Sequence, residues 1–148
     1  MMKITGKKIC ILIVSITVVL NLGWFLMTTY KYAKFVEAVP KNKWGLYFVV
    51  KEDGYMYSVK KPDYLTFTGN LAVADNKKME ALFIWPLMSG GYEYGYRRQD
   101  NGAAYEIYVD ENMEPIHKDD MVEVQKIKEH KAELEALFSK ANKMWQLK

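Results

Sequence analysis

The sequence predicts an α+β protein with an N-terminal transmembrane helix, then about six antiparallel strands in a hairpin meander, packed by one long C-terminal helix. Three observations carry this prediction. Residues 9–27 are apolar and uncharged, Asp53-Gly54 and Asn101-Gly102 separate alternating apolar segments, and no Gly or Pro interrupts residues 120–145. Alternation between turn signals is typical of strands, and apolar residues at helical spacing are typical of a helix.

The first element is the apolar run Ile9–Met27, whose only small polar side chains are Ser15, Thr17 and Asn21. As a helix it would span about 28 Å, close to the thickness of the hydrocarbon core of a bilayer. The run predicts a signal-anchor that contacts the lipid bilayer. It follows a short basic segment, residues 1–8, which we expect to stay in the cytoplasm.

Two points about this anchor stay open at the level of sequence. A cleaved signal peptide is the alternative, and Val36-Glu37-Ala38 fits a small-residue cleavage pattern loosely. The lysines that flank the run are nearly balanced in number, so orientation rests on the short basic tail. Cys10 is the only cysteine and excludes a disulfide framework. We therefore expect the cytoplasmic membrane of a bacterial cell, with the domain in the envelope outside it.

Residues 28–43 are expected to form a juxtamembrane tether ahead of an extracytoplasmic domain at 44–148. The alternative is a short helix that Pro40 would end. One side of that helix would carry Tyr32, Phe35, Val36 and Val39.

The domain begins with a predicted hairpin over residues 44–60. A two-residue Asp53-Gly54 loop would place Glu52 opposite Tyr55. This register puts Tyr47 on the outer face of the sheet. Its inner face would carry Trp44, Leu46, Phe48, Val50, Tyr57 and Val59.

The next two strands are predicted at 64–73 and 79–85. Gly69, inside the first of them, indicates a bulge or a close approach of another backbone segment. The second is apolar on both faces apart from Glu80, which is typical of an inner strand, and Pro86 ends it.

A second hairpin is predicted around Asn101-Gly102, the preferred pair for a type I′ turn. Counting back from the turn, Arg98 faces Tyr105 at the rim of the inner face, and Arg97 faces Glu106 as an ion pair. Tyr92, Tyr94 and Tyr96 then point into the core, and Tyr108 lies over Gly95 on the outer face.

The last element is a predicted helix over residues 120–145, with Asp120 and Glu123 resembling a capping box. Lys131 interrupts its apolar stripe. We expect the helix to pack on the sheet, and partner binding or self-association is the alternative. The stripe consists of Val124, Ile127, Leu134, Phe138, Ala141 and Trp145, widened by Leu137 and Met144.

Charge and motif content argue against several classes of function. Three of the 21 basic side chains precede residue 28, so the other 18 balance the 18 acidic ones, which does not suit a nucleic-acid binder. His117 and His130 belong to no metal-binding or catalytic motif, and no serine lies in a nucleophile motif. We expect no catalytic, cofactor-binding or metal-binding residues.

The prediction for function is a small single-pass membrane protein whose noncatalytic domain binds a protein partner or an envelope ligand, as an accessory or immunity-type factor. Two alternatives are a structural subunit that assembles through the anchor and the C-terminal helix, and an unrecognised hydrolase. A cavity that gathers His117 with Ser89, or two carboxylates with perturbed pKa values, would favour the hydrolase. The oligomeric state is left open. Aromatic and arginine side chains near the outer face are the candidate contacts: Tyr47, Trp85, Arg98 and Tyr108.

Overall fold

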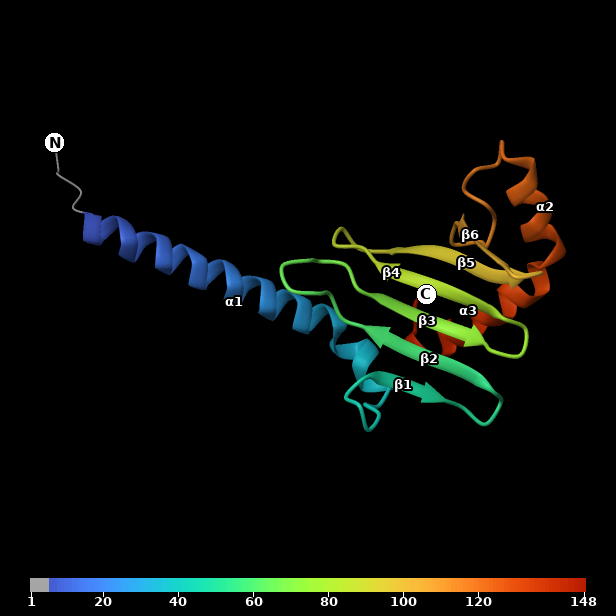
Figure 1. Cartoon of the computed structure of the whole chain (residues 1–148), viewed down its shortest axis with the longest axis horizontal. Coiled ribbons are helices and arrows are strands. Elements are labelled where there is room, and N and C mark those ends of the chain that lie inside the picture. The colour runs from blue at the N-terminus through green and yellow to red at the C-terminus, as the bar shows by residue number, and fades with distance from the viewer. Residues whose placement is uncertain (1–5) are drawn as a thin grey trace.

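The computed structural model describes residues 6–148, in which a long helix projects from one end of a six-stranded antiparallel sheet (Figure 1). The strands follow each other in space in the same order as in the chain, β1 to β6. The predicted α+β meander is therefore confirmed. The elements are α1 (Gly6–Ala38), β1 (Tyr47–Val50), β2 (Tyr55–Lys60), β3 (Asn70–Asp75), β4 (Glu80–Pro86), β5 (Tyr92–Asp100), β6 (Ala103–Val109), α2 (Met121–Glu129) and α3 (Lys131–Trp145).

The N-terminal part of α1 stands free of the rest of the molecule. Among residues 6–148 it is the one helix long and apolar enough to cross a membrane, and none of its most apolar stretch is buried by protein. The first five residues of the predicted basic tail lie outside the described residues, and Lys7 and Lys8 already belong to the helix.

The C-terminal part of α1 belongs to the core, so the prediction of a tether at 28–43 is wrong. Tyr32, Phe35 and Val39 are fully or almost fully buried against the sheet. These positions are three and four residues apart and so share one helix face. No Gly or Pro separates them from the apolar run, and α1 continues unbroken to Ala38, just before Pro40. The core thus includes side chains that precede residue 44.

The core lies between the inner face of the sheet and two helical segments, the end of α1 and α3. Tyr94 and Tyr96 are buried there, as their strand parity predicts. The other large contributors are Val59, Leu71, Val73, Leu82, Ile84, Ile107, Val109, Met113, Ile127, Leu134, Leu137 and Trp145.

The β1–β2 hairpin differs from the predicted register by one residue. Its loop has three residues, since the Lys51 N–H donates to the Tyr55 carbonyl at 2.9 Å. Gly54 has φ +85°, the left-handed conformation that closes a three-residue loop as a bulge. Tyr47 consequently pairs with Val59 and lies on the inner face, while Phe48 pairs with Ser58 on the outer face. The prediction of an outward Tyr47 is wrong.

The strand predicted at 64–73 begins only at Asn70, where β3 starts. Residues 61–69 form a loop beside α1. Gly69 marks a close approach, as predicted. A Cβ there would lie 2.0 Å from the Lys60 carbonyl oxygen, and the buried Gly69 N–H donates to the Tyr32 hydroxyl at 2.7 Å. β4 is an inner strand, also as predicted.

The β5–β6 hairpin has the predicted register throughout. Asn101 and Gly102 have φ +49° and +83°, and Arg98 pairs with Tyr105. One detail of the outer face differs. Gly95 is covered by Trp85 of β4, whose ring would lie 2.8 Å from a Cβ at Gly95, and not by Tyr108.

The predicted C-terminal helix is two helices, α2 and α3, which meet at His130 with φ −112°. Asp120 caps α2 by accepting from the Val122 and Glu123 N–H groups, as expected for the N-cap. Lys131, the interruption in the apolar stripe, lies just after the break. Its ammonium donates to the Asn112 and Met113 carbonyls at 3.1 and 3.0 Å, which ties the start of α3 to the turn after β6.

Candidate functional site

No helix of residues 6–148 covers the outer face of the sheet. In Figure 1 α3 lies behind the sheet and the near face is bare. The pairing register assigns this face a mostly apolar centre that runs across all six strands. We call it the open sheet face, and its apolar members are Phe48, Val50, Met56, Ala72, Ala74, Ala81, Phe83, Trp85 and Tyr108.

Stacked aromatic rings form one half of the open sheet face. Phe83 and Trp85 have ring centroids 6.1 Å apart and nearly parallel planes, and Trp85 lies 5.8 Å from Tyr108. The Arg97 guanidinium lies 4.5 Å above the Phe83 ring and donates to Glu106 at 2.6 Å. Aromatic and arginine side chains of this kind carry much of the binding energy in protein interfaces.

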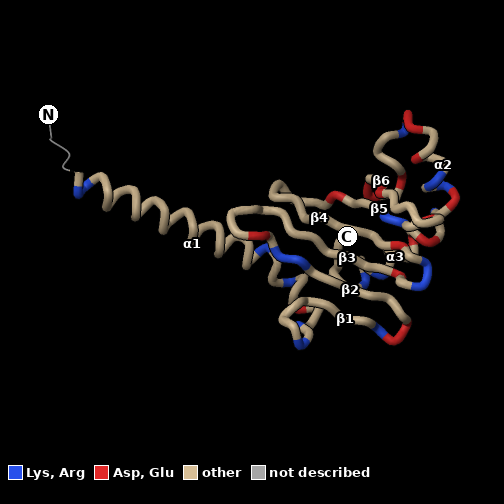
Figure 2. Tube along the Cα trace, viewed as in Figure 1, with Lys and Arg blue, Asp and Glu red and all other residues tan. Residues whose placement is uncertain are grey.

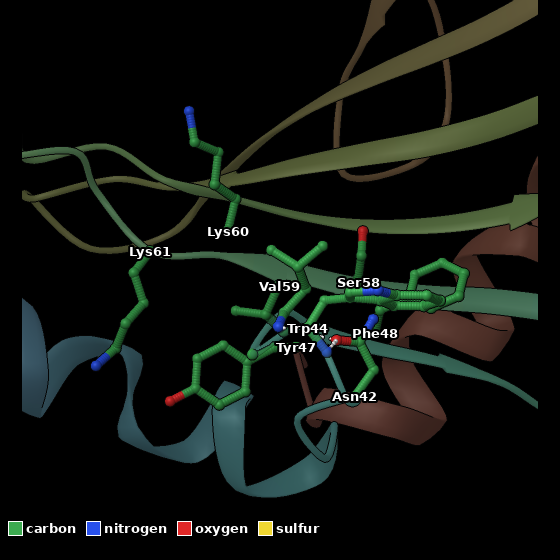
Figure 3. Close-up of a pocket in the computed structure, with 10 residues that line it drawn as sticks. Asn42, Trp44, Tyr47, Phe48, Ser58, Val59, Lys60 and Lys61 are labelled. Atoms are coloured by element: carbon green, nitrogen blue, oxygen red, sulfur yellow. Dashed lines mark hydrogen bonds between the residues drawn. The ribbon is translucent and has the colours of Figure 1, made fainter.

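A groove of about 590 Å³ lies at the other end of the open sheet face, beside β1. Its wall is apolar, with Trp44 and Leu46 72% and 62% exposed next to Phe48. Figure 3 shows the Lys60 and Lys61 side chains extending away from that wall, so the ammonium groups lie at its rim.

The loop that presents Trp44 and Leu46 is held in place by Asn42. Its side-chain carbonyl accepts from the backbone N–H groups of both residues, at 2.9 and 3.0 Å. The sequence prediction missed the groove because it placed Trp44, Leu46 and Phe48 on the inner face. The Glu52-Asp53-Gly54 sequence is the signal that allows the correct three-residue loop.

Arg98, a predicted contact residue, is bound within the chain. Its guanidinium donates to the buried Glu80 carboxylate at 2.9 Å and to Asp100 at 2.9 Å. The Tyr96 hydroxyl donates to the same Glu80 oxygen at 3.0 Å, and burial raises the pKa of Tyr96 far above its ordinary value. Arg98 lies at the rim of the inner face, as predicted, where it neutralises a buried carboxylate.

The structure therefore separates the four predicted contact residues into two pairs. Trp85 and Tyr108 meet on the open sheet face, and Tyr108 is 44% exposed. Tyr47 and Arg98 lie on the inner side, where Tyr47 packs against the core with the Lys41 ammonium 5.1 Å from its ring. Tyr47 is only partly buried and also lines the groove beside β1 (Figure 3).

Within residues 6–148 the two carboxyl groups with shifted pKa values, Asp53 and Asp100, are ion-paired. The hydrogen bond from Lys140 lowers the pKa of Asp53, and the one from Arg98 lowers the pKa of Asp100. A general acid needs the opposite shift. Within residues 6–148 no three His, Cys, Asp or Glu side chains gather as metal ligands, and Ser89 and His117 do not line the groove beside β1.

The chain matches no protein-family model, no curated protein sequence and no solved structure. The fold and the site together define a class, which is an apolar helix continuous with a one-sheet α+β domain that leaves one sheet face uncovered. A function therefore has to be argued from the apolar surface of α1 and from the open sheet face with the groove beside it.

Proposed function

We propose that this is a single-pass membrane protein that uses its open sheet face to bind a protein partner outside the cytoplasmic membrane, as an accessory or immunity-type factor. The observation that carries the proposal is an uncovered, aromatic sheet face in a domain built directly onto an apolar helix. Large exposed apolar patches on small domains are typical of interaction sites.

The pattern of hydrogen bonds along α1 supports its role as the anchor. The hydroxyls of Ser15 and Thr17 donate to the carbonyls four residues earlier, and the Asn21 amide donates to the Thr17 carbonyl at 2.8 Å. Polar groups inside a bilayer have to be satisfied by the protein itself. In Figure 2 no charge interrupts α1 between its first turn and the segment that meets the sheet.

Burial of the end of α1 supports an uncleaved anchor over a cleaved signal peptide. Cleavage after Ala38 would remove Tyr32 and Phe35 from the core, and removal of one buried aromatic side chain typically costs about 3–5 kcal/mol. The domain and the helix are therefore best understood as one folded unit.

Binding through the open sheet face is favoured over strand addition, because both sheet edges are partly covered. Beside β1, the backbone of Lys41 forms an isolated antiparallel β-bridge with Tyr47, and the Phe48 N–H donates to the Pro40 carbonyl at 3.3 Å. Beside β6, the backbone of Pro115 forms an isolated antiparallel β-bridge with Val109. A partner that adds a strand would have to displace these segments.

Assembly through the C-terminal helix has less support. The apolar stripe of α3 packs in the core, since Leu134, Leu137 and Ala141 are fully buried, and it is not available to a partner. The surfaces left for that alternative are the anchor and the start of α2, where Met121 and Val122 are 73% and 64% exposed. The orientation proposed here, with the N-terminus in the cytoplasm, rests on the short basic tail.

The test is photo-crosslinking in the native membrane with a benzophenone amino acid at Phe83 on the open sheet face. The matched control carries it at Lys128, which is exposed on α2. We expect a discrete crosslinked partner at Phe83 that Trp85→Ala weakens, and none at Lys128. Equal crosslinking at both positions, or none at Phe83, would refute the proposal, and products containing only this chain would favour self-assembly. Protease added to spheroplasts should digest the domain, and full protection would reverse the orientation.

A further inference from the structure

The two ends of the sheet differ in the side chains that their loops expose. The turns at the end far from α1, at 51–55, 76–79 and 100–103, are rich in charged and amide side chains, with Met79 as their one exposed large apolar residue. The 61–69 loop at the other end reaches back along α1 (Figure 1). Its tip exposes Tyr64, Leu65 and Phe67 by 66%, 54% and 44%.

This loop is bonded to the part of α1 that lies within the predicted span. The Trp24 indole N–H donates to the Thr66 carbonyl at 2.6 Å, and the Tyr64 hydroxyl donates to the Asn21 side-chain oxygen. The rings of Trp24 and Tyr64 also meet edge to face, with centroids 5.3 Å apart. The loop is thereby held at a defined height along the helix.

The level of Asn21 and Trp24, at which the loop contacts α1, lies inside the predicted membrane span, residues 9–27. A helix needs about 20 residues to cross the hydrocarbon core, so a span that starts after Lys8 has to continue to the region of Met27. Asn21 is six residues before Met27, which corresponds to about 9 Å along the helix axis. Amphipathic segments that lie in a membrane interface bury their apolar side by a similar depth, about 5–10 Å.

The backbone of the loop supports the same reading. Leu65 has φ +59°, a left-handed conformation that bulky side chains rarely adopt and that Gly or Asn adopt at lower cost. Leucine at this turn is thus unfavourable for the turn itself, and its side chain is 54% exposed at the tip of the loop. The Thr66 N–H donates to the Asp63 carbonyl at 2.9 Å, which leaves fewer backbone groups to be satisfied by solvent.

We propose that the 61–69 loop is a second membrane-contact element, which inserts Tyr64, Leu65 and Phe67 into the boundary between headgroups and acyl chains beside α1. The inference rests on α1 being the anchor. The occupant of this surface is the lipid bilayer, because the loop is continuous with the surface of the helix that crosses it. With two contacts the domain cannot swivel about α1, and the strands, which run roughly along α1 in Figure 1, hold the open sheet face upright on the membrane.

The test uses the full chain with Cys10→Ser, reconstituted as one copy per nanodisc of phosphatidylcholine and phosphatidylglycerol. A single cysteine replaces Val19, Leu65 or Met79 and carries an NBD fluorophore. The lipids are supplied with or without a doxyl quencher, which is deep in the acyl chains for the label at 19 and shallow for the labels at 65 and 79. Met79 is the matched control, since it too is an exposed apolar residue with positive φ, +56°, but lies in a turn at the far end.

We expect the labels at 19 and 65 to emit at shorter wavelength and lose intensity with the quencher, and the label at 79 to change in neither respect. A quenched label at 19 with a label at 65 as unaffected as that at 79 would overturn the membrane-contact loop and leave the anchor standing. An unaffected label at 19 would overturn the anchor and the loop together.

A second pair of variants separates lost membrane contact from unfolding. With the fluorophore at a cysteine replacing Phe67, Leu65→Asn should reduce quenching while the urea midpoint stays the same or rises, because Asn tolerates positive φ. Met79→Asn should leave quenching unchanged. Full quenching in Leu65→Asn would contradict a role for the leucine side chain in the bilayer.

Discussion

Replacement of Tyr32 tests whether the end of α1 is part of the folded domain or a tether. Tyr32 is fully buried, and its hydroxyl accepts the Gly69 N–H at 2.7 Å. Truncation of a buried aromatic side chain costs about 3–5 kcal/mol. Tyr32→Phe removes only the acceptor and leaves a buried N–H unsatisfied, which costs about 1–3 kcal/mol. Tyr30 lies two residues away but is 88% exposed, so Tyr30→Ala should change stability by less than about 0.5 kcal/mol.

The assay is urea unfolding of the full chain in a nonionic micelle, followed by near-UV circular dichroism, because α1 stays helical in the micelle and would mask the transition at far-UV wavelengths. We expect the order wild type ≈ Tyr30→Ala > Tyr32→Phe > Tyr32→Ala in the free energy of unfolding. Equal stabilities of the Tyr30→Ala and Tyr32→Ala variants would show that the segment is a tether and that its packing against the sheet contributes nothing.

Three further predictions concern the sheet. Burial raises the pKa of Tyr94 to about 12, above the value near 10 of an unfolded tyrosine, so its contribution is complete below pH 10 and falls by about 1.4 kcal/mol per pH unit as the pH rises towards 12. Urea midpoints from pH 9 to 11.5 should show a shallower decline in Tyr94→Phe. Glu80→Ala should cost about 1–3 kcal/mol because it removes the buried acceptor of both Arg98 and the Tyr96 hydroxyl while Asp100 still pairs with Arg98, whereas Glu93→Ala on the exposed side of β5 should be near neutral in the same assay. Gly95→Ala should cost about 1–3 kcal/mol, because the new methyl meets the Trp85 indole, which can move. Gly69→Ala should cost more, because its methyl meets a backbone carbonyl oxygen, which cannot. Thermal midpoints in the reverse order would contradict this reasoning.

The parts of the fold that the sequence predicted correctly are those with strong local signals. Asn101 and Gly102 both accept positive φ, and a one-residue shift of the β5–β6 pairing would mix apolar and polar side chains on both faces. Turn chemistry and strand pattern therefore agree on one register. The uncharged run at 9–27 is equally clear, because its length and composition are visible without knowledge of its neighbours.

The candidate site was only half predictable, and the β1–β2 hairpin shows why. Glu52-Asp53-Gly54 permits loops of two or three residues, and β1 is apolar on both faces, so neither register is excluded by local pattern. The choice depends on which side chains pack on the core. That packing sends Tyr47 inward and leaves Phe48 outward beside Trp44, and it creates the groove that the sequence prediction missed.

By itself the sequence determined the apolar run at 9–27, the order of the strands, the Asn101-Gly102 hairpin and the balance of charges in residues 28–148, because each depends on composition or on residues close together in the chain. Tertiary structure alone decided that α1 continues into the core, that the C-terminal helix breaks at His130, and that the 61–69 loop lies against α1. Each of these depends on contacts between segments distant in sequence. A periodic apolar stripe shows that a face will be covered, and only the packed structure shows what covers it.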